Sequence, residues 1–461
     1  MQAPGSRDRT MGAQFSCESG ACLSLSTDRM PNRPALVALI VFAGLLGLPT
    51  GRSLAQTSSA GPAVEIFTSQ STGGSAPGGS IVGGGTPGGS TGLLPLARPL
   101  NISFSLSAGY DDNVNTSAFD AQDSLYASLG VYLSYAFGTE RTQAILSTNS
   151  SVAYYATGDQ GNRFEYRPNL ELTLSVRHAV SERLTLNGSA FVKYALEPDF
   201  ELDVSLNRRS GNYFYTAESL AATYLLLERW TTITTFSFST IQYEDEAIAI
   251  FQDRQEQGFG QQVRFLVLPL TTAIGEYRLG LVDFEAPNRD STTHSLLIGV
   301  DQTIGPRVSG SLRVGAEFRT IEGGDTTAIN PYADTTLSCV FGERTSVSFN
   351  ARYSTEESDF VESPSRQTFR TGLSVAYGLT PRITSSLGAY YRHDSNEGTS
   401  SDFFSQPGFT EDSLDIALSF SYAINPRISA NAGYNRTQVF SQTDERSYSR
   451  NRYFAGVSIA F

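Results

Sequence analysis

The chain of 461 residues has few of the residues that build most enzyme and metal sites. It contains three cysteines, three histidines, one tryptophan and a single lysine, Lys193, so arginine supplies nearly all of its 33 basic residues. Cys17 and Cys22 fall in a segment that we expect to be removed, and Cys339 alone can form no internal disulfide. Cysteine therefore indicates neither a disulfide framework nor a metal site, and we predict no metal and no cofactor.

Basic clusters and catalytic motifs are also missing. A formal net charge of −13 without any basic cluster argues against a nucleic-acid partner. No Ser–His–acid grouping, Walker loop, zinc spacing or dinucleotide fingerprint stands out, so we predict that the protein is not an enzyme. The runs Asp111–Asn113 and Glu244–Glu246 could offer oxygen ligands to calcium, but such runs are more often simply solvated.

Long apolar runs occur only near the start of the chain. Residues 30–55 have the pattern of a signal peptide: basic Arg33, an apolar run of 14 residues over 35–48, and small residues before Gln56. We expect residues 1–29 to be an N-terminal extension that results from a start codon assigned too early, with Met30 as the true start. Residues 56–100 are rich in Gly, Ser and Pro and predict a flexible periplasmic segment. After residue 50 no run approaches the roughly 20 residues of a membrane-spanning helix.

Residues 101–461 instead alternate apolar and polar side chains. The pattern continues to the last residue, where Tyr453, Val457, Ile459 and Phe461 share one face. An apolar face on a final strand suits a barrel in a bilayer, whose last strand must pair with its first because no sheet edge can stay open in hydrocarbon. We expect these four residues to form the signal that the barrel-assembly machinery reads.

A hairpin repeat fills this region. Two strands of about ten residues, a tight turn and a longer acidic loop recur, as in bacterial outer-membrane barrels with periplasmic turns and external loops. The pattern predicts an all-β, antiparallel, up-and-down transmembrane barrel of about 18 strands, with 16 as the alternative. Eight tight turns are recognisable, and seven of them end in arginine: Arg141, Arg183, Arg229, Arg307, Arg344, Arg382 and Arg427.

The two faces of the predicted strands differ in polarity. Leu125, Leu129 and Leu133 exemplify the face that we place against outer-membrane lipid, and Tyr and Phe near strand ends would form the interfacial girdles. The opposite face carries many charges, which cost too much in lipid and must face a watery lumen. The strongest candidates for a pore-lining patch are six arginines on neighbouring strands: Arg313, Arg319, Arg352, Arg366, Arg370 and Arg392.

Two interpretations of these arginines stay open at this point. Rings of arginine in a lumen favour the passage of anions. Alternatively, the arginines pair with carboxylates and only hold the wall together.

One segment resembles a known family. Residues 102–114, with the sequence Tyr110-Asp-Asp-Asn-Val114 after the first strand, resemble the opening of the Putative β-barrel porin 2 family, although Gly109 stands where an acid is usual. The resemblance implies an outer-membrane location. It favours a porin that passes small hydrophilic solutes, with an outer-membrane role in exopolysaccharide export or anchoring as the alternative. A homotrimer, the state of many porins, remains open.

Overall fold

The computed structural model describes residues 99–156, 165–196, 211–322, 327–360, 363, 365–400, 405–406 and 408–461. The expected extension 1–29, the expected signal peptide 30–55 and nearly all of the flexible segment 56–100 lie outside the described residues.

The described chain is almost entirely β-structure. Val, Ile, Thr, Tyr and Phe are frequent in its strands, as expected for side chains that pack on a pleated surface. The elements are β1 (Leu100–Asp111), β2 (Ser124–Gly138), β3 (Thr142–Tyr155), β4 (Glu165–Ala179), β5 (Leu184–Leu196), β6 (Asn212–Leu227), β7 (Trp230–Tyr243), α2 (Glu246–Gln252), β8 (Arg254–Leu268), β9 (Thr271–Phe284), β10 (Ser291–Ile304), η2 (Gly305–Arg307), β11 (Val308–Ile321), β12 (Thr327–Phe341), β13 (Thr345–Glu356), β14 (Arg366–Thr380), β15 (Ile383–Asn396), β16 (Thr399–Ser400), β17 (Ser405–Gln406), β18 (Phe409–Asn425), β19 (Ile428–Ser441), η3 (Asp444–Arg446) and β20 (Tyr448–Ala460).

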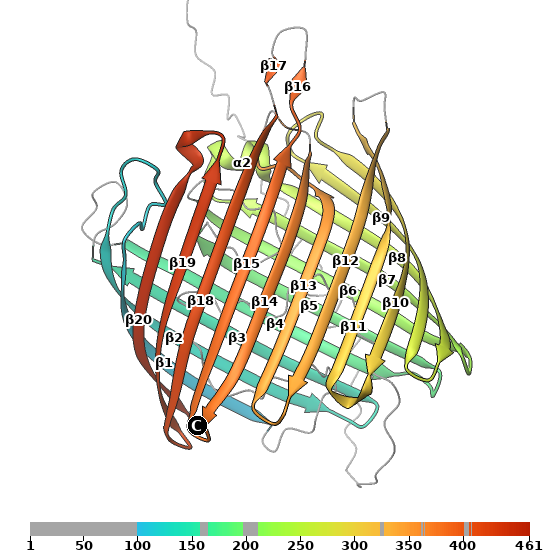
Figure 1. Ribbon diagram of the computed structural model, residues 1–461, viewed down its shortest axis with the longest axis horizontal. Coiled ribbons are helices and arrows are strands. Elements are labelled where there is room, and N and C mark those ends of the chain that lie inside the picture. Colours follow the sequence, from blue (N-terminus) through green and yellow to red (C-terminus); the bar gives the residue numbers. More distant parts are fainter. Residues whose placement is uncertain are drawn as a thin grey trace, which may run out of the picture. The chain divides into compact units, whose positions relative to one another are not determined.

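Eighteen of these strands form one closed antiparallel barrel (Figure 1). Each strand pairs with its neighbour in the chain, and the barrel closes where β20 pairs with β1, from Ser103 opposite Ala460 to Asp111 opposite Arg452. The remaining two strands, β16 and β17, form a separate small hairpin in a loop. The predicted fold is therefore confirmed with 18 strands, not 16. No helix in the described part of the chain is long and apolar enough to cross a membrane.

The strand register separates an outer apolar face from an inner polar one. Leu106 stands opposite Leu129, and both point outward with 62% and 57% of their surface exposed. One position away, Ser107 stands opposite Ser128, which points inward and is buried. Because side chains alternate along a strand, this pairing puts the apolar and polar residues of this hairpin on opposite faces.

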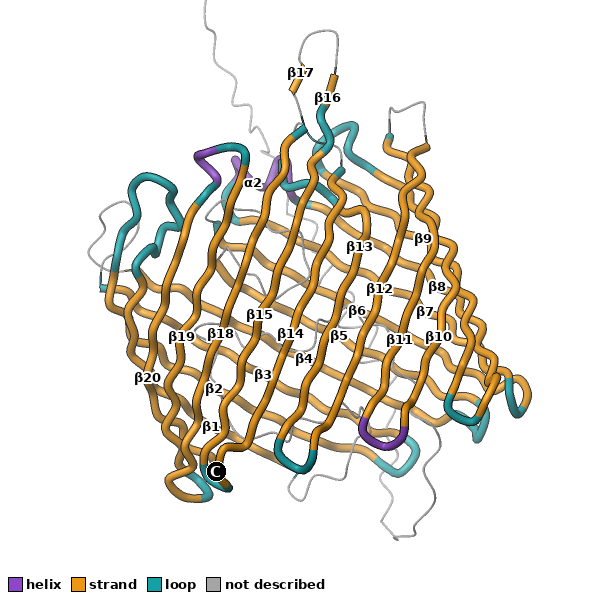
Figure 2. Tube along the Cα trace, in the orientation of Figure 1, coloured by secondary structure: helices purple, strands orange, loops and turns teal. Residues whose placement is uncertain are grey.

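The two ends of the barrel differ in their connections (Figure 2). Short turns lie at the end that also holds the C-terminus, and longer loops with α2 and the β16–β17 hairpin lie at the other. Gly305 and Gly342 adopt φ angles of +67° and +63° in two of the turns, a region that favours glycine. Short turns are periplasmic in outer-membrane barrels, so the end with the loops faces outward.

Candidate functional site: the lumenal arginine network

The six predicted pore-lining arginines all lie on the inner face of the barrel. Strand register places Arg370 of β14 directly opposite Arg352 of β13 and Arg392 of β15, so three guanidinium groups follow one another across three strands. Arg366 lies on the same face of β14, four residues from Arg370. Arg313 and Arg319 occupy β11, where Arg313 stands opposite Asp334 of β12.

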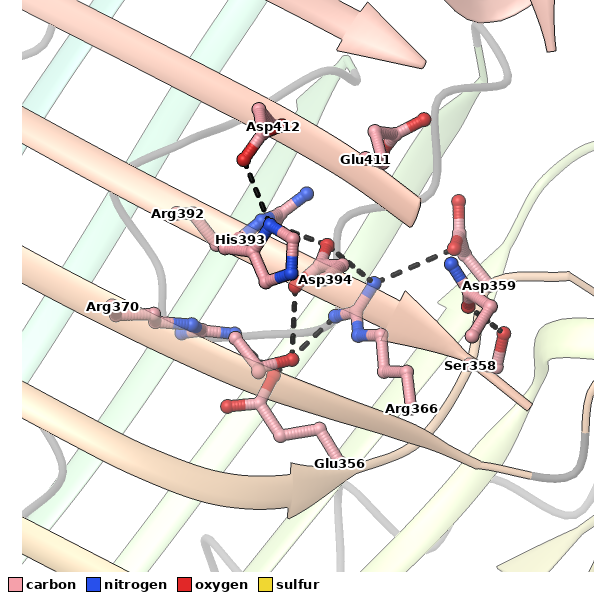
Figure 3. A network of polar contacts seen from close by, with 12 residues as sticks. Glu356, Ser358, Asp359, Arg366, Arg370, Arg392, His393, Asp394, Glu411 and Asp412 are labelled. Carbon is pink, nitrogen blue, oxygen red and sulfur yellow. Dashed lines mark hydrogen bonds and ion pairs between the residues drawn. The ribbon is translucent and has the colours of Figure 1, made fainter. Parts of the chain in front are cut away.

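The arginines of β13, β14 and β15 share three carboxylates (Figure 3). Glu356 binds Arg352 at 2.8 Å, Arg366 at 3.4 Å, and Arg370. Asp394 binds Arg392 at 3.0 Å and Arg366 at 3.6 Å. Asp359 in the β13–β14 loop adds a third contact to Arg366, at 3.4 Å. Each guanidinium of this group thus has at least one carboxylate beside it.

The two arginines of β11 use other acids. Arg313 binds Asp301 of β10 at 2.7 Å and approaches Glu276 of β9 to 3.9 Å. Arg319 binds Glu357, at the start of the β13–β14 loop, at 2.5 Å. The six arginines therefore meet six carboxylates: Glu276, Asp301, Glu356, Glu357, Asp359 and Asp394.

Burial explains this pairing. The side chains of Arg313 and Arg366 are each only 1% exposed, and an isolated buried guanidinium would be strongly destabilising. Arg352 and Arg370 differ, since their side chains keep 27% and 18% of their surface. These two arginines are the members of the set most accessible from the lumen.

A loop folds into the outer mouth of the barrel. The β13–β14 connection, residues 357–365, contains Ser358, Asp359, Ser363 and Ser365, all at most 4% exposed, which is unusual for a connecting loop. Ser358 Oγ donates to Asn396 of β15 at 2.8 Å. The loop thus lies within the barrel and supplies two of the six carboxylates of the network.

Contacts from distant strands hold this loop across the mouth. Gln252 of α2 donates to the Asp359 carbonyl at 3.1 Å, and Arg289 of the β9–β10 loop donates to the Ser358 carbonyl at 2.7 Å. From the other side, Arg446 of η3 binds the Asp359 carboxylate at 2.7 Å. Because α2 follows β7 while η3 precedes β20, these contacts reach the loop from well-separated parts of the wall. Ser358 and Asp359 of the loop are therefore held at the outer mouth by contacts from several parts of the barrel.

The charge of Arg446 is secured by its surroundings. Burial alone would lower the pKa of this guanidinium, but the carboxylates of Asp359 and Glu411 outweigh burial and raise the pKa above its usual value. The guanidinium of Arg446 therefore stays positively charged over the accessible pH range.

Helix α2 packs inside the mouth against the wall opposite the arginines. Its Ile248 contacts the lumenal residues Ala195, Tyr213, Ile241 and Tyr243. Asp253, just after the helix, accepts a hydrogen bond from the Tyr243 amide at 2.8 Å. Burial, with a smaller effect of nearby Glu285, raises the pKa of the Asp253 carboxyl to about 6. This acid is therefore close to its titration point at neutral pH.

The residues of the expected assembly signal lie along the closure between β20 and β1. Phe461 donates its amide to the Ile102 carbonyl at 2.9 Å, and its ring meets that of Phe104 edge to face at 6.0 Å. Tyr453 stacks against Tyr434 of β19 at 4.9 Å. Val457 and Ile459 point outward and are exposed on the surface expected to face lipid.

The segment that carries the family resemblance fixes the same closure at the outer end. Asp111 accepts from Arg450 Nε at 2.9 Å, and Asp112 accepts from the Asn451 side chain at 2.7 Å. Asn113 donates to the Ser449 carbonyl at 2.9 Å. The sequence suggested calcium ligands here, whereas the structure uses these oxygens to join the first strand to the last.

The remaining candidate chemistry is dispersed. His178 contacts Thr142, His294 contacts Tyr277, and His393 contacts Asp412, each at 2.7–2.8 Å and each on different strands. Among the residues that the structure describes, no group of three or more His, Cys, Asp or Glu side chains could hold a metal ion.

Three solved structures illustrate what the chain is similar to. Pseudomonas aeruginosa OpdK with vanillate is 11% identical, with 78% of this chain and 99% of that chain covered and a TM-score of 0.43. A BenF-like porin from Pseudomonas fluorescens Pf-5 is 10% identical with the same coverage and TM-score. The siderophore receptor PirA from Pseudomonas aeruginosa is 8% identical, with 79% and 81% covered and a TM-score of 0.40.

Family membership rests on the sequence match. No curated protein shows significant similarity to the chain. Residues 100–461, which comprise the whole barrel, match the family described as Putative beta-barrel porin 2. The chain therefore belongs to the Putative beta-barrel porin 2 family and is a β-barrel protein of the bacterial outer membrane.

Proposed function

We propose that the barrel is a passive porin for small hydrophilic solutes. The observation that carries this proposal is the inner face of the wall, which is polar and charged on strand after strand while the outer face is apolar. A barrel of 18 strands is wide enough to enclose an aqueous channel.

Within this proposal, Arg352 and Arg370 are the residues that contact a passing solute. Their side chains are the most exposed of the six arginines, and they share the carboxylate of Glu356. The more deeply buried Arg313, Arg319, Arg366 and Arg392 hold the wall and the folded-in loop in place. In this proposal, Arg352 and Arg370 favour the passage of anions, while the other four arginines pair with carboxylates and hold the wall together.

Single-channel recording in planar bilayers tests conduction. Purified protein should give stable open channels, and the reversal potential in a salt gradient should report ion selectivity. At about 8 Å in water, one unit charge is worth about 0.5 kcal/mol, or roughly a twofold change in the anion-to-cation permeability ratio. The double variant Arg352→Gln/Arg370→Gln should lower that ratio by about fourfold.

Glu356→Gln is the matched control, since it removes the opposite charge from the same contact. It should raise the anion-to-cation ratio by about twofold. Equal selectivity in the wild type and both variants would contradict the role assigned to Arg352 and Arg370. Absence of channels would contradict the porin proposal itself.

The folded-in loop favours a second candidate, a role in exopolysaccharide export or anchoring. In that role, the part of the loop that α2, Arg289 and Arg446 hold at the mouth would limit conduction until another component displaced it. A silent barrel in bilayers, together with loss of surface polysaccharide in a deletion strain, would support this alternative over the porin.

A further inference from the structure

Seven arginines occupy one repeated position at the periplasmic end of the barrel. Each is the residue immediately before the second strand of a hairpin, and six of them accept a backbone hydrogen bond from the neighbouring hairpin. The six bonds are Ala179 N to Arg141 O, Leu225 N to Arg183 O, Leu266 N to Arg229 O, Gly378 N to Arg344 O, Ala423 N to Arg382 O and Ala460 N to Arg427 O, all 2.7–2.9 Å. The seventh, Arg307, ends η2 before β11. The arginines therefore follow the rim of the barrel.

The register points this ring toward the lumen. Arg427 bonds Ala460, which stands opposite Ser103, a buried residue of the inner face. Alternation along the strands gives the other six the same lumenal position. The eighth turn has Leu270 there, and its carbonyl accepts from Thr303 at 2.9 Å in the same way.

These rim arginines differ from those inside the barrel in having no acidic partner. All seven are exposed. No ion pair or hydrogen bond engages the guanidinium group of any of them within the described part of the chain, whereas every arginine of the lumenal network is paired. A guanidinium held at a channel mouth without a carboxylate is available to an external anion.

Charge and spacing define the kind of anion. The chain carries a net charge of −13, yet its eight turns hold seven Arg against four Glu, a local charge of +3. Successive turns are two strands apart, so the arginines of successive turns stand about 10 Å from each other, and the gaps at Leu270 and at the β20–β1 closure are about twice as wide. One small anion cannot span that distance, while a flexible chain with repeated carboxylates can contact several arginines at once and bind through multivalency.

We propose that this periplasmic ring of seven arginines binds an acidic polysaccharide at the inner mouth of the barrel. The lumenal register favours such a chain over lipid phosphates, which would meet the outer side of the rim. The inference rests on the orientation of the barrel and does not require that the lumen conduct, so it can fail or succeed separately from the porin proposal.

Binding to the intact protein in phosphatidylcholine nanodiscs tests the proposal. The probe is polygalacturonate, with neutral dextran of equal length and monomeric galacturonate as comparisons. Polygalacturonate should bind at least tenfold more tightly than either comparison at low salt. In 1 M salt, where the Debye length is about 3 Å, the difference should vanish.

Two matched triple variants identify the site. Arg307→Gln/Arg344→Gln/Arg382→Gln removes three consecutive positive charges and should weaken polygalacturonate binding about tenfold. Glu140→Gln/Glu182→Gln/Glu228→Gln removes three negative charges from equivalent turns and should strengthen it. Leu270→Arg, which places an arginine in the eighth turn, should also strengthen binding and keeps the proposal testable if the arginine variant does not fold. Heat-modifiable mobility on gels reports folding.

Three outcomes would overturn the inference. The first is wild-type binding no tighter to polygalacturonate than to dextran. The second is equal binding by galacturonate monomer, which would indicate a small-anion site. The third is polygalacturonate affinity unchanged by all variants while the arginine variant alters insertion into phosphatidylglycerol nanodiscs, which would assign the ring to lipid headgroups.

Discussion

The ion pair between Asp111 and Arg450 offers a sharp test of how the barrel closes. It joins the end of β1 to the start of β20, and its two side chains are 0% and 5% exposed. Arg450 donates from both Nε and Nη2, so the pair is bidentate, and Tyr155 adds a hydroxyl donor to Asp111 at 3.4 Å. Asp111→Asn keeps the shape of the side chain and removes its charge.

The expected cost follows from burial. Removing one partner of a buried ion pair leaves the other charge uncompensated and typically costs about 3–5 kcal/mol. The pair lies near the mouth of the barrel, where water can partly replace the lost carboxylate, so we expect about 3 kcal/mol. The double variant Asp111→Asn/Arg450→Gln should recover at least about 1 kcal/mol of this, because no unpaired charge remains.

Urea unfolding of the protein refolded in lipid vesicles measures these values. Trp230, the only tryptophan, lies on β7 far from the closure and reports global unfolding. Glu171→Gln is the control, since it breaks the Lys193–Glu171 pair of 2.8 Å inside the β4–β5 hairpin. Asp111→Asn should also speed the hydrogen exchange of backbone amides in β1 and β20, whereas Glu171→Gln should not. A loss below about 0.5 kcal/mol, or exchange unchanged in those strands, would refute the reasoning.

Three further predictions follow from the structure. Deletion of Phe461 removes its hydrogen bond to Ile102 and its ring contact with Phe104, so membrane levels of folded barrel should fall; unchanged levels on fractionation would contradict this. The pKa of Asp253 is about 6 in the folded protein, above its ordinary value of 3.8. Between these two pH values the folded protein binds a proton that the unfolded chain does not. The free energy of unfolding should therefore rise as the pH falls from 7 to 4. Protection of α2 amides from exchange should rise accordingly, and Asp253→Asn should abolish the pH dependence. Glu218 points outward from β6 and stands opposite Phe238. If lipid covers this position, Glu218→Leu should raise the free energy of unfolding by about 1–3 kcal/mol. If the variant shows no such gain but its oligomeric mass in detergent changes, a second subunit covers the position instead.

The alternation of apolar and polar residues was sufficient to predict the barrel, because every strand of a membrane barrel has one face against lipid. Residues such as Leu125, Leu129 and Leu133 had to share a face, and a one-residue slip would have put serines into hydrocarbon. The tight turns located the hairpins, which gave the count of 18. The small β16–β17 hairpin was not predicted, since a polar loop carries no such constraint.

The candidate site could be predicted only in part. The alternation in the sequence placed all six arginines on the inner face, because a charged side chain is costly against lipid. The alternation did not identify the carboxylates that pair with these arginines. Glu356 and Asp394 lie on the same strands with nothing in the sequence to mark them as partners, and Glu357 and Asp359 belong to a loop. Which carboxylate meets which guanidinium depends on how that loop folds back, and a loop leaves no periodic signal.

The folding of this loop can nevertheless be understood from the charges of the wall. Arg319 and Arg366 are 4% and 1% exposed on their strands, and each takes a carboxylate from the loop, Glu357 and Asp359. If the segment swung out of the mouth, Arg319 would lose Glu357, and Arg366 would lose one of the three carboxylates beside it. The wall and the described part of the loop thus stabilise each other through these ion pairs.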